Sequence, residues 1–106
     1  MPQRHLSLSE LALVIYMLRG TPNAERFLTQ LPTIKVEEMN DGNMGSLLFA
    51  SSKQDRRLGD AIAEIRFQDE DDIPVLVSLN VDQDGDLYEL DSWKVDFSPL
   101  KRIPNF

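Results

Sequence analysis

Residues Pro74–Leu100 have the sequence PVLVSLNVDQDGDLYELDSWKVDFSPL, and this stretch decides the expected fold. Its first part has the period-two alternation of a half-buried strand. The apolar positions of that alternation are Val75, Val77, Leu79 and Val81. Asp84-Gly85 then supplies the backbone conformation that a tight hairpin turn requires. A second strand, which contains the only tryptophan, Trp93, completes a long antiparallel hairpin.

The second strand of this hairpin does not alternate strictly, because its apolar residues change parity between Leu90 and Trp93. One extra residue near Asp91-Ser92, a β-bulge, would restore the pattern and keep unpaired carboxylates out of the core. The bulge would turn five side chains inward: Tyr88, Leu90, Trp93, Val95 and Phe97. It would turn three outward: Glu89, Lys94 and Asp96. The alternative is strict alternation with a buried polar site at Glu89 and Asp91.

The bulge makes Trp93 a core residue that contacts the first helix, near Leu11, Ile15 or Leu18. Trp93→Ala is then expected to unfold or nearly unfold the protein, while Lys94→Ala should be close to neutral. The alternative places Trp93 outward as the anchor of an interface.

Two helices are expected before residue 34. Ser7 and Glu10 have the spacing of a capping box, apolar residues then recur at helical spacing, and Gly20 is placed to end this helix. Thr21-Pro22 predicts the start of a second helix, with threonine as its cap and proline in its first turn. The apolar face of the second helix is Ala24, Phe27, Leu28 and Leu31. Because the link is short, the two helices should form a hairpin.

From Ile34 onward the apolar period changes to two, which predicts strands at 34–37, 44–50 and 61–68 ahead of the long hairpin. Helices followed by strands with short turns indicate an α+β fold. We expect an N-terminal helix hairpin packed on one face of a five-stranded antiparallel meander sheet. The chain should be a single domain over residues 1–106, with loosely packed tails at 1–6 and 101–106.

The charge is uneven along the 106 residues. The formal net charge is -7, and the charges of residues 1–53 cancel, so the excess lies in the second half. An acidic surface repels phosphate backbones, so no nucleic-acid partner is expected. A protein partner should present a basic surface, and the alternative is an acidic face that only keeps the protein solvated. The apolar stretch Leu11–Leu18 is too short to span a bilayer, so no membrane partner is expected. There is no cysteine, and Met1–His5 lacks the apolar run of a signal peptide, so we expect a cytoplasmic protein.

The acidic hairpin turn resembles part of a calcium-binding loop. Alternate carboxylates can converge on a hard cation, and the candidates here are Asp82, Asp84, Asp86 and Glu89. The spacing of the glycine and the glutamate does not fit the helix-loop-helix calcium motif, and aspartate and glycine are ordinary turn residues. We therefore expect no bound metal and no cofactor.

Two further clusters are candidate binding sites. Asp91, Lys94 and Asp96 could perform acid–base chemistry if they were desolvated, although an exposed pattern of charges needs no function. Residues Met39–Ser46 contain Gly42, which suits a turn, and Gly45, which is unfavourable in a strand unless another group approaches the backbone closely. A neighbouring strand is the simpler explanation of Gly45, and a ligand is the other.

The sequences at 41–47 (DGNMGSL) and 87–100 (LYELDSWKVDFSPL) resemble those of a bacterial family of small single-domain proteins, a domain of unknown function. The resemblance covers Glu10 to Pro104 and implies an intracellular protein with no assigned activity, cofactor or catalytic residues. It emphasises seven residues as binding candidates: Asp41, Gly42, Gly45, Asp91, Trp93, Lys94 and Asp96.

Two functions remain open at this point. The first is a small non-enzymatic protein-binding module, with an immunity protein of a bacterial toxin as one form of it by analogy with other small acidic α+β proteins. The second is an enzyme or a small-ligand-binding domain that uses the Asp91, Lys94 and Asp96 cluster beside the Asp41–Ser46 turn. The second requires the two motifs to meet around a concave pocket.

Overall fold

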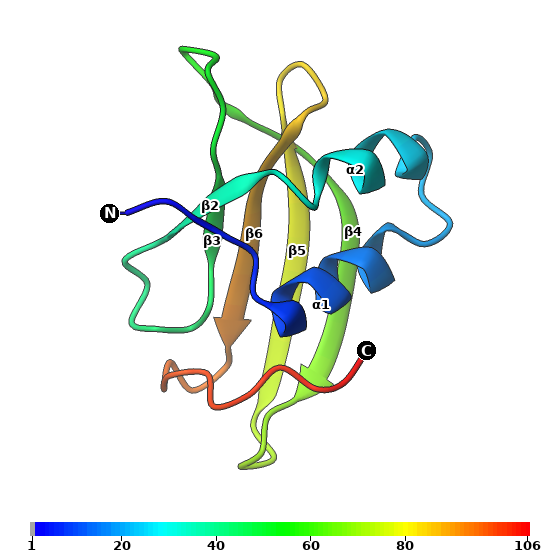
Figure 1. The fold of residues 1–106 in the computed structure, drawn as a ribbon. Coiled ribbons are helices and arrows are strands. Elements are labelled where there is room, and N and C mark those ends of the chain that lie inside the picture. Colours follow the sequence, from blue (N-terminus) through cyan, green and yellow to red (C-terminus); the bar gives the residue numbers. More distant parts are fainter. Residues whose placement is uncertain (1) are drawn as a thin grey trace.

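The computed structural model describes residues 2–106 and contains two helices and six strands (Figure 1). The helices are α1 (Leu8–Leu18) and α2 (Ala24–Gln30). The strands are β1 (Arg4–His5), β2 (Lys35–Glu38), β3 (Leu47–Phe49), β4 (Leu58–Gln68), β5 (Pro74–Asp82) and β6 (Leu87–Lys94). The predicted α+β class is confirmed. None of the helices within residues 2–106 has the length and apolar character needed to span a membrane.

Helix α1 begins where the capping box predicts. The backbone N–H of Glu10 donates to Ser7 Oγ at 3.2 Å, and the backbone N–H of Ser7 donates to Glu10 Oε1 at 2.8 Å. The guanidinium of Arg4 also pairs with the Glu10 carboxylate at 2.7 Å. The start of α1 is therefore bound to strand β1 as well as capped.

Helix α2 begins later than Thr21-Pro22 predicted. Its N-cap is Asn23, which has a left-handed backbone with φ of 65°. The hydroxyl of Thr21 instead donates to the carbonyl of Leu18 at 2.7 Å, so it serves the end of α1. The prediction of Thr21 as the cap of α2 was wrong, because both its hydroxyl and its backbone N–H donate to the Leu18 carbonyl at the end of α1.

The strands form one antiparallel sheet in the order β1-β2-β3-β6-β5-β4. This order differs from the expected five-stranded meander in two ways. Strand β1 adds a sixth member, and β6 lies between β3 and β5. The chain reaches β4 through residues 50–57, which we call the crossover segment because it passes the ends of β6 and β5 (Figure 1). The crossover segment has no apolar periodicity, so no sequence pattern indicated the reordering.

The pairing register divides the central strands into two faces, since directly paired residues share a face. One face packs against α1 and α2 and forms the core, which includes Leu13, Val14, Leu18, Phe27, Val36, Leu47, Phe49, Val75, Val77, Leu79 and Leu90. We call the other face the open face. On strands β4 to β6 it includes Glu64, Arg66, Leu76, Ser78, Asn80, Glu89, Asp91 and Trp93. Both helices lie on the core side of the sheet (Figure 1).

The β-bulge expected at Asp91-Ser92 was wrong. Pairing of β6 with β5 is continuous there, and the register shift lies at Asn80/Val81, near the hairpin turn. Trp93 therefore belongs to the open face and is 42% exposed, whereas Lys94 belongs to the core face and is fully buried. The alternative of a buried site at Glu89 and Asp91 was also wrong, because Glu89 is half-buried and Asp91 is exposed.

At both ends of the chain, where tails were expected, residues contact the sheet. Arg4 and His5 pair with β2 as strand β1. The segment after β6 packs Leu100 and Ile103 against the core. The ring of Phe106 lies 4.8 Å from that of Tyr16 on α1. The C-terminal segment runs across the end of the sheet beside α1 (Figure 1).

Candidate functional site

An apolar patch occupies one end of the open face. Its members are Leu76, Trp93, Val95 and Phe97, which are between 37% and 69% exposed, and we call them the Trp93 patch. Leu76 pairs directly with Trp93 across the two strands. The rings of Trp93 and Phe97 lie 6.1 Å apart at an interplanar angle of 56°. Large exposed aromatic side chains at adjacent positions are typical of interaction surfaces.

A tight turn after β6 holds Phe97 in this position. Phe97 has a left-handed backbone with φ of 64°, a conformation that a non-glycine residue adopts at a cost in energy. Its backbone N–H donates to the carbonyl of Lys94 at 2.9 Å. The Asp96 carboxylate accepts from the hydroxyl of Ser98 at 2.6 Å and from its backbone N–H at 3.0 Å. The bond from the Ser98 hydroxyl is the main reason that the pKa of Asp96 is lowered.

Negative charge predominates on the open face beside the Trp93 patch. Glu64, Glu89 and Asp91 lie on the same face of strands β4 to β6, against one cation, Arg66. None of these four side chains takes part in the ion pairs formed within residues 2–106. The open face therefore combines exposed aromatic rings with carboxylates that have no cationic partner of their own.

Lys94, which the sequence grouped with Asp91 and Asp96, has different partners. Its Nζ atom donates to Asp69 Oδ2 at 2.8 Å, to Asp71 Oδ2 at 2.7 Å and to the carbonyl of Pro99 at 3.2 Å. The side chains of Lys94 and Asp69 are both fully buried. The sequence showed Asp69 only as part of an acidic turn, and nothing in its spacing linked that turn to β6.

The Asp69 carboxylate also orders the C-terminal segment. It accepts hydrogen bonds from the backbone N–H groups of Lys101 at 2.7 Å, Arg102 at 3.0 Å and Glu70 at 2.7 Å. Burial alone would raise the pKa of Asp69, but the ion pair with Lys94 and these N–H donors outweigh it and lower the pKa to about 2. Burial would lower the pKa of Lys94, and its two carboxylates instead raise it. This cluster is saturated by partners within the chain.

The Asp41–Ser46 turn does meet the second motif. Asp41 accepts from the backbone N–H of Met44 at 3.1 Å and from that of Ser46 at 3.0 Å. The hydroxyl of Ser46 donates to the Ser92 carbonyl at 3.2 Å and accepts from the Ser92 N–H at 2.9 Å. The enzyme or ligand-binding alternative required the two motifs to meet around a concave pocket. They meet at Ser46 and Ser92, where their polar groups bind one another, and not through the side chains of Asp91, Lys94 or Asp96.

The two glycines of this turn have backbone reasons for being glycine. Gly42 has φ of +75° and Gly45 has φ of +100°. A β-carbon at Gly45 would lie 3.0 Å from the side chain of Leu100, so a neighbouring residue approaches the backbone closely there. The contact that explains Gly45 is a side chain of the C-terminal segment.

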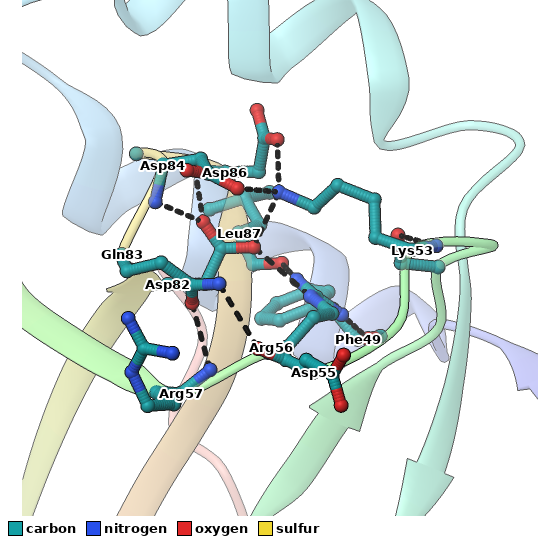
Figure 2. Close-up of polar contacts among 12 residues, drawn as sticks. Phe49, Lys53, Asp55, Arg56, Arg57, Asp82, Gln83, Asp84, Asp86 and Leu87 are labelled. Carbon is teal, nitrogen blue, oxygen red and sulfur yellow. Dashed lines mark hydrogen bonds and ion pairs between the residues drawn. The ribbon is translucent and has the colours of Figure 1, made fainter.

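The acidic hairpin turn surrounds a lysine from the crossover segment (Figure 2). Lys53 Nζ lies 2.7 Å from Asp82 Oδ2, 2.7 Å from Asp86 Oδ2 and 3.2 Å from Asp84 Oδ2. Glu89, the fourth candidate ligand, is placed elsewhere and accepts a long bond from Asn80 at 3.4 Å. Within the described range 2–106, no group of three or more histidine, cysteine, aspartate or glutamate side chains is arranged to hold a metal ion.

Arg56 joins three strands at the same end of the sheet (Figure 2). Its guanidinium donates to Asp82 Oδ2 at 2.9 Å, to the carbonyl of Phe49 at 2.8 Å and to the carbonyl of Leu87. Burial would raise the pKa of Asp82, but the bonds from Lys53, from backbone N–H groups of the turn and from Arg56 hold it well below its usual range. The network fixes the crossover segment to the hairpin.

Three open cavities adjoin the crossover segment, with volumes of about 280, 440 and 290 Å³. All three are lined by Ala50 and Ser51, and none by the seven predicted binding residues. Lys53 and Arg56 line two of them, but both cations are already paired with Asp82. Those two cavities therefore offer no free cation to an anionic ligand.

Comparison with known proteins identifies a matching family model but no function. A family model matches residues 3–104 of the chain. No curated protein and no solved structure matches it.

Proposed function

Because the matching model is described as Domain of unknown function (DUF6984), the chain belongs to that family, and we propose from its own geometry that it is a protein-binding module. Its contact surface is the open face around the Trp93 patch. The observation that carries the proposal is the exposure of Trp93 and Phe97, 42% and 69%, on the side of the sheet away from the helices.

The chemistry of the patch supports this role over a catalytic one. Tryptophan is enriched at the centres of protein interfaces, where a large rigid ring buries much apolar area with little loss of rotamer entropy. The groups suited to acid–base work, Lys94 and Asp69, are fully buried and bind one another. The partner should present a basic surface, since Glu64, Glu89 and Asp91 of the open face form no ion pair within residues 2–106.

Affinity capture from the organism that encodes the protein tests this proposal. The bait is the wild-type chain, a Trp93→Ala/Phe97→Ser variant, or a Leu8→Ser control. Leu8 is 86% exposed on α1, on the other side of the sheet, so its loss removes a comparable exposed apolar group.

We expect a stoichiometric protein that the wild type and the Leu8→Ser control retain and the patch variant loses. Purified bait and captured protein should then bind directly in calorimetry. The same set of proteins on all three baits, with the patch variant shown to be folded by circular dichroism, would contradict the proposal.

A further inference from the structure

Arginine–aromatic stacking occurs three times within residues 2–106. The guanidinium carbon lies 4.0 Å from the ring centroid of Tyr16 for Arg19, 4.6 Å from that of Phe27 for Arg26, and 4.9 Å from that of Tyr88 for Arg56. The indole of Trp93, the side chain best suited to this interaction, has no such partner within residues 2–106. Trp93 is 42% exposed, so part of its surface is accessible to a cation from outside.

We propose, building on the binding role above, that the Trp93 patch receives an arginine side chain of a basic partner segment. The guanidinium stacks on the indole of Trp93 and pairs with the carboxylate of Asp91. Asp91 precedes Trp93 by two residues on the same face of β6, so the two side chains leave the strand about 7 Å apart, within the span of one arginine side chain.

The side chains of the open face lie in rows across the strands, and this arrangement favours arginine over lysine as the residue that the partner presents. Glu64, Ser78 and Asp91 form one row across three strands, and Arg66, Leu76 and Trp93 form the next. A planar guanidinium can lie flat on the indole while its edge donates two parallel hydrogen bonds to a carboxylate. A lysine ammonium is a point charge and can satisfy only part of this arrangement.

The turn after β6 presents the second ring in a fixed position. Phe97 is held by its bond to the Lys94 carbonyl, and Lys94 Nζ binds the Pro99 carbonyl and so closes the same turn from the core side. Because the turn is ordered before binding, little conformational entropy remains to be lost when a partner docks.

A second copy of the chain is a poorer occupant of this surface. In a two-fold dimer through the open face, Glu64, Glu89 and Asp91 of one copy would oppose the same carboxylates of the other. Arg66 is the one cation on these three strands of the open face, and it lies two strands from Trp93 in the same row. A basic partner neutralises the carboxylates, whereas a second copy doubles them.

The test is titration with the acetylated and amidated peptide Gly-Arg-Gly-Arg-Gly-Arg-Gly, against analogues with lysine or glutamate in place of arginine. Trp93 is the only tryptophan, so its fluorescence and the NMR signal of its indole N–H report on this site directly. We expect saturable changes of both signals with the arginine peptide. The lysine peptide should bind about threefold more weakly or worse, and the glutamate peptide should not bind.

Matched variants locate the binding site. Asp91→Asn should weaken the arginine peptide by roughly three- to tenfold, while Glu25→Gln, which removes an exposed charge from α2, should leave its affinity unchanged. Arg66→Gln should strengthen binding, because it removes a competing cation from the open face.

Equal binding of the arginine and lysine peptides, or peptide shifts that leave the Trp93 indole N–H in place, would overturn the inference. A dimer of the free protein that Trp93→Ala dissociates would overturn it as well. If the captured partner depends on Trp93 but the arginine peptide does not bind, the binding role stands and the arginine assignment fails.

Discussion

The ammonium of Lys94 lies 2.8 Å from the carboxylate of Asp69, and both side chains are completely buried between the end of β6 and the C-terminal segment. The next residue toward the N-terminus, Trp93, faces solvent. Apolar and charged side chains thus occupy the reverse of their usual positions at this end of β6. This reversal determines both the stability of the turn and the chemistry of the open face.

Lys94→Met should destabilise the protein strongly. It removes the cation that neutralises Asp69 and leaves a buried carboxylate unpaired, which costs far more than the loss of a surface ion pair. We expect the melting temperature, followed by circular dichroism, to fall by roughly 10 °C or more. Lys101→Met is the matched control, because the side chain of Lys101 is exposed and only its backbone binds Asp69. Equal melting temperatures for the two variants would refute the prediction.

Stability should decrease on acidification through the range in which Asp69 titrates. The pKa of Asp69 is about 2 in the folded protein against an ordinary value of 3.8, so the unfolded chain binds more protons between these values. The stabilisation is complete above about pH 5 and is lost as the pH falls through 3.8 toward 2. Urea unfolding at several pH values measures this loss. An NMR titration of the Asp69 carboxyl with a midpoint near 4 would show the prediction to be wrong.

Trp93→Ala should leave the fold intact. A side chain that is 42% exposed on the open face leaves no closed cavity when it is truncated, so we expect a loss of about 1 kcal/mol or less in the free energy of unfolding. Leu79→Ala, at a fully buried position of β5, should cost about 2–5 kcal/mol. In the native wild-type protein, tryptophan emission should be red-shifted and quenched by acrylamide. Blue-shifted, protected emission would contradict the orientation of β6.

Arg56→Lys should loosen the end of the sheet. Lysine cannot reach Asp82 and the carbonyls of Phe49 and Leu87 together, so at least one buried acceptor loses its donor. We expect a loss of roughly 1–3 kcal/mol in the free energy of unfolding by urea denaturation. Arg57→Lys, next to it and exposed, should change the stability little. An Arg56→Lys variant as stable as the wild type would mean that Arg56 acts through its charge alone.

The elements that the sequence predicted correctly depend on neighbours close along the chain. The capping box at Ser7 and Glu10, the hairpin turn at Gly85 and the period-two strands are local patterns, and they led to the α+β class. The facing of β6 was predicted wrongly, because apolar identity was used to decide which side is buried. Lys94 can be buried because Asp69 and Asp71 approach it from the β4–β5 turn, and no local pattern shows that approach.

The candidate-site residues likewise include some that local sequence patterns indicated and some that they did not. Asp41, Gly42 and Gly45 were recognised as unusual, and their contacts with Ser46, Ser92 and Leu100 supply structural reasons for them. The exposure of Trp93 and Phe97 was not predicted, although an outward Trp93 was the stated alternative. The left-handed backbone of Phe97 carries no sequence signal, because glycine or asparagine would ordinarily mark it.

The crossover segment has a consequence for the order in which the sheet assembles. Strands β4, β5 and β6 follow one another in sequence and can pair with short loops, whereas β3 and β6 are neighbours in the sheet but distant along the chain. Closing that long loop costs chain entropy before any contact rewards it. We expect β4–β6 to form the folding nucleus and the β3–β6 pairing to follow, with amide hydrogens of β3 exchanging faster than those of β5. We expect the network of Lys53 and Arg56 around Asp82 to slow the separation of the two halves of the sheet, since it joins the crossover segment and β3 to the β5–β6 hairpin.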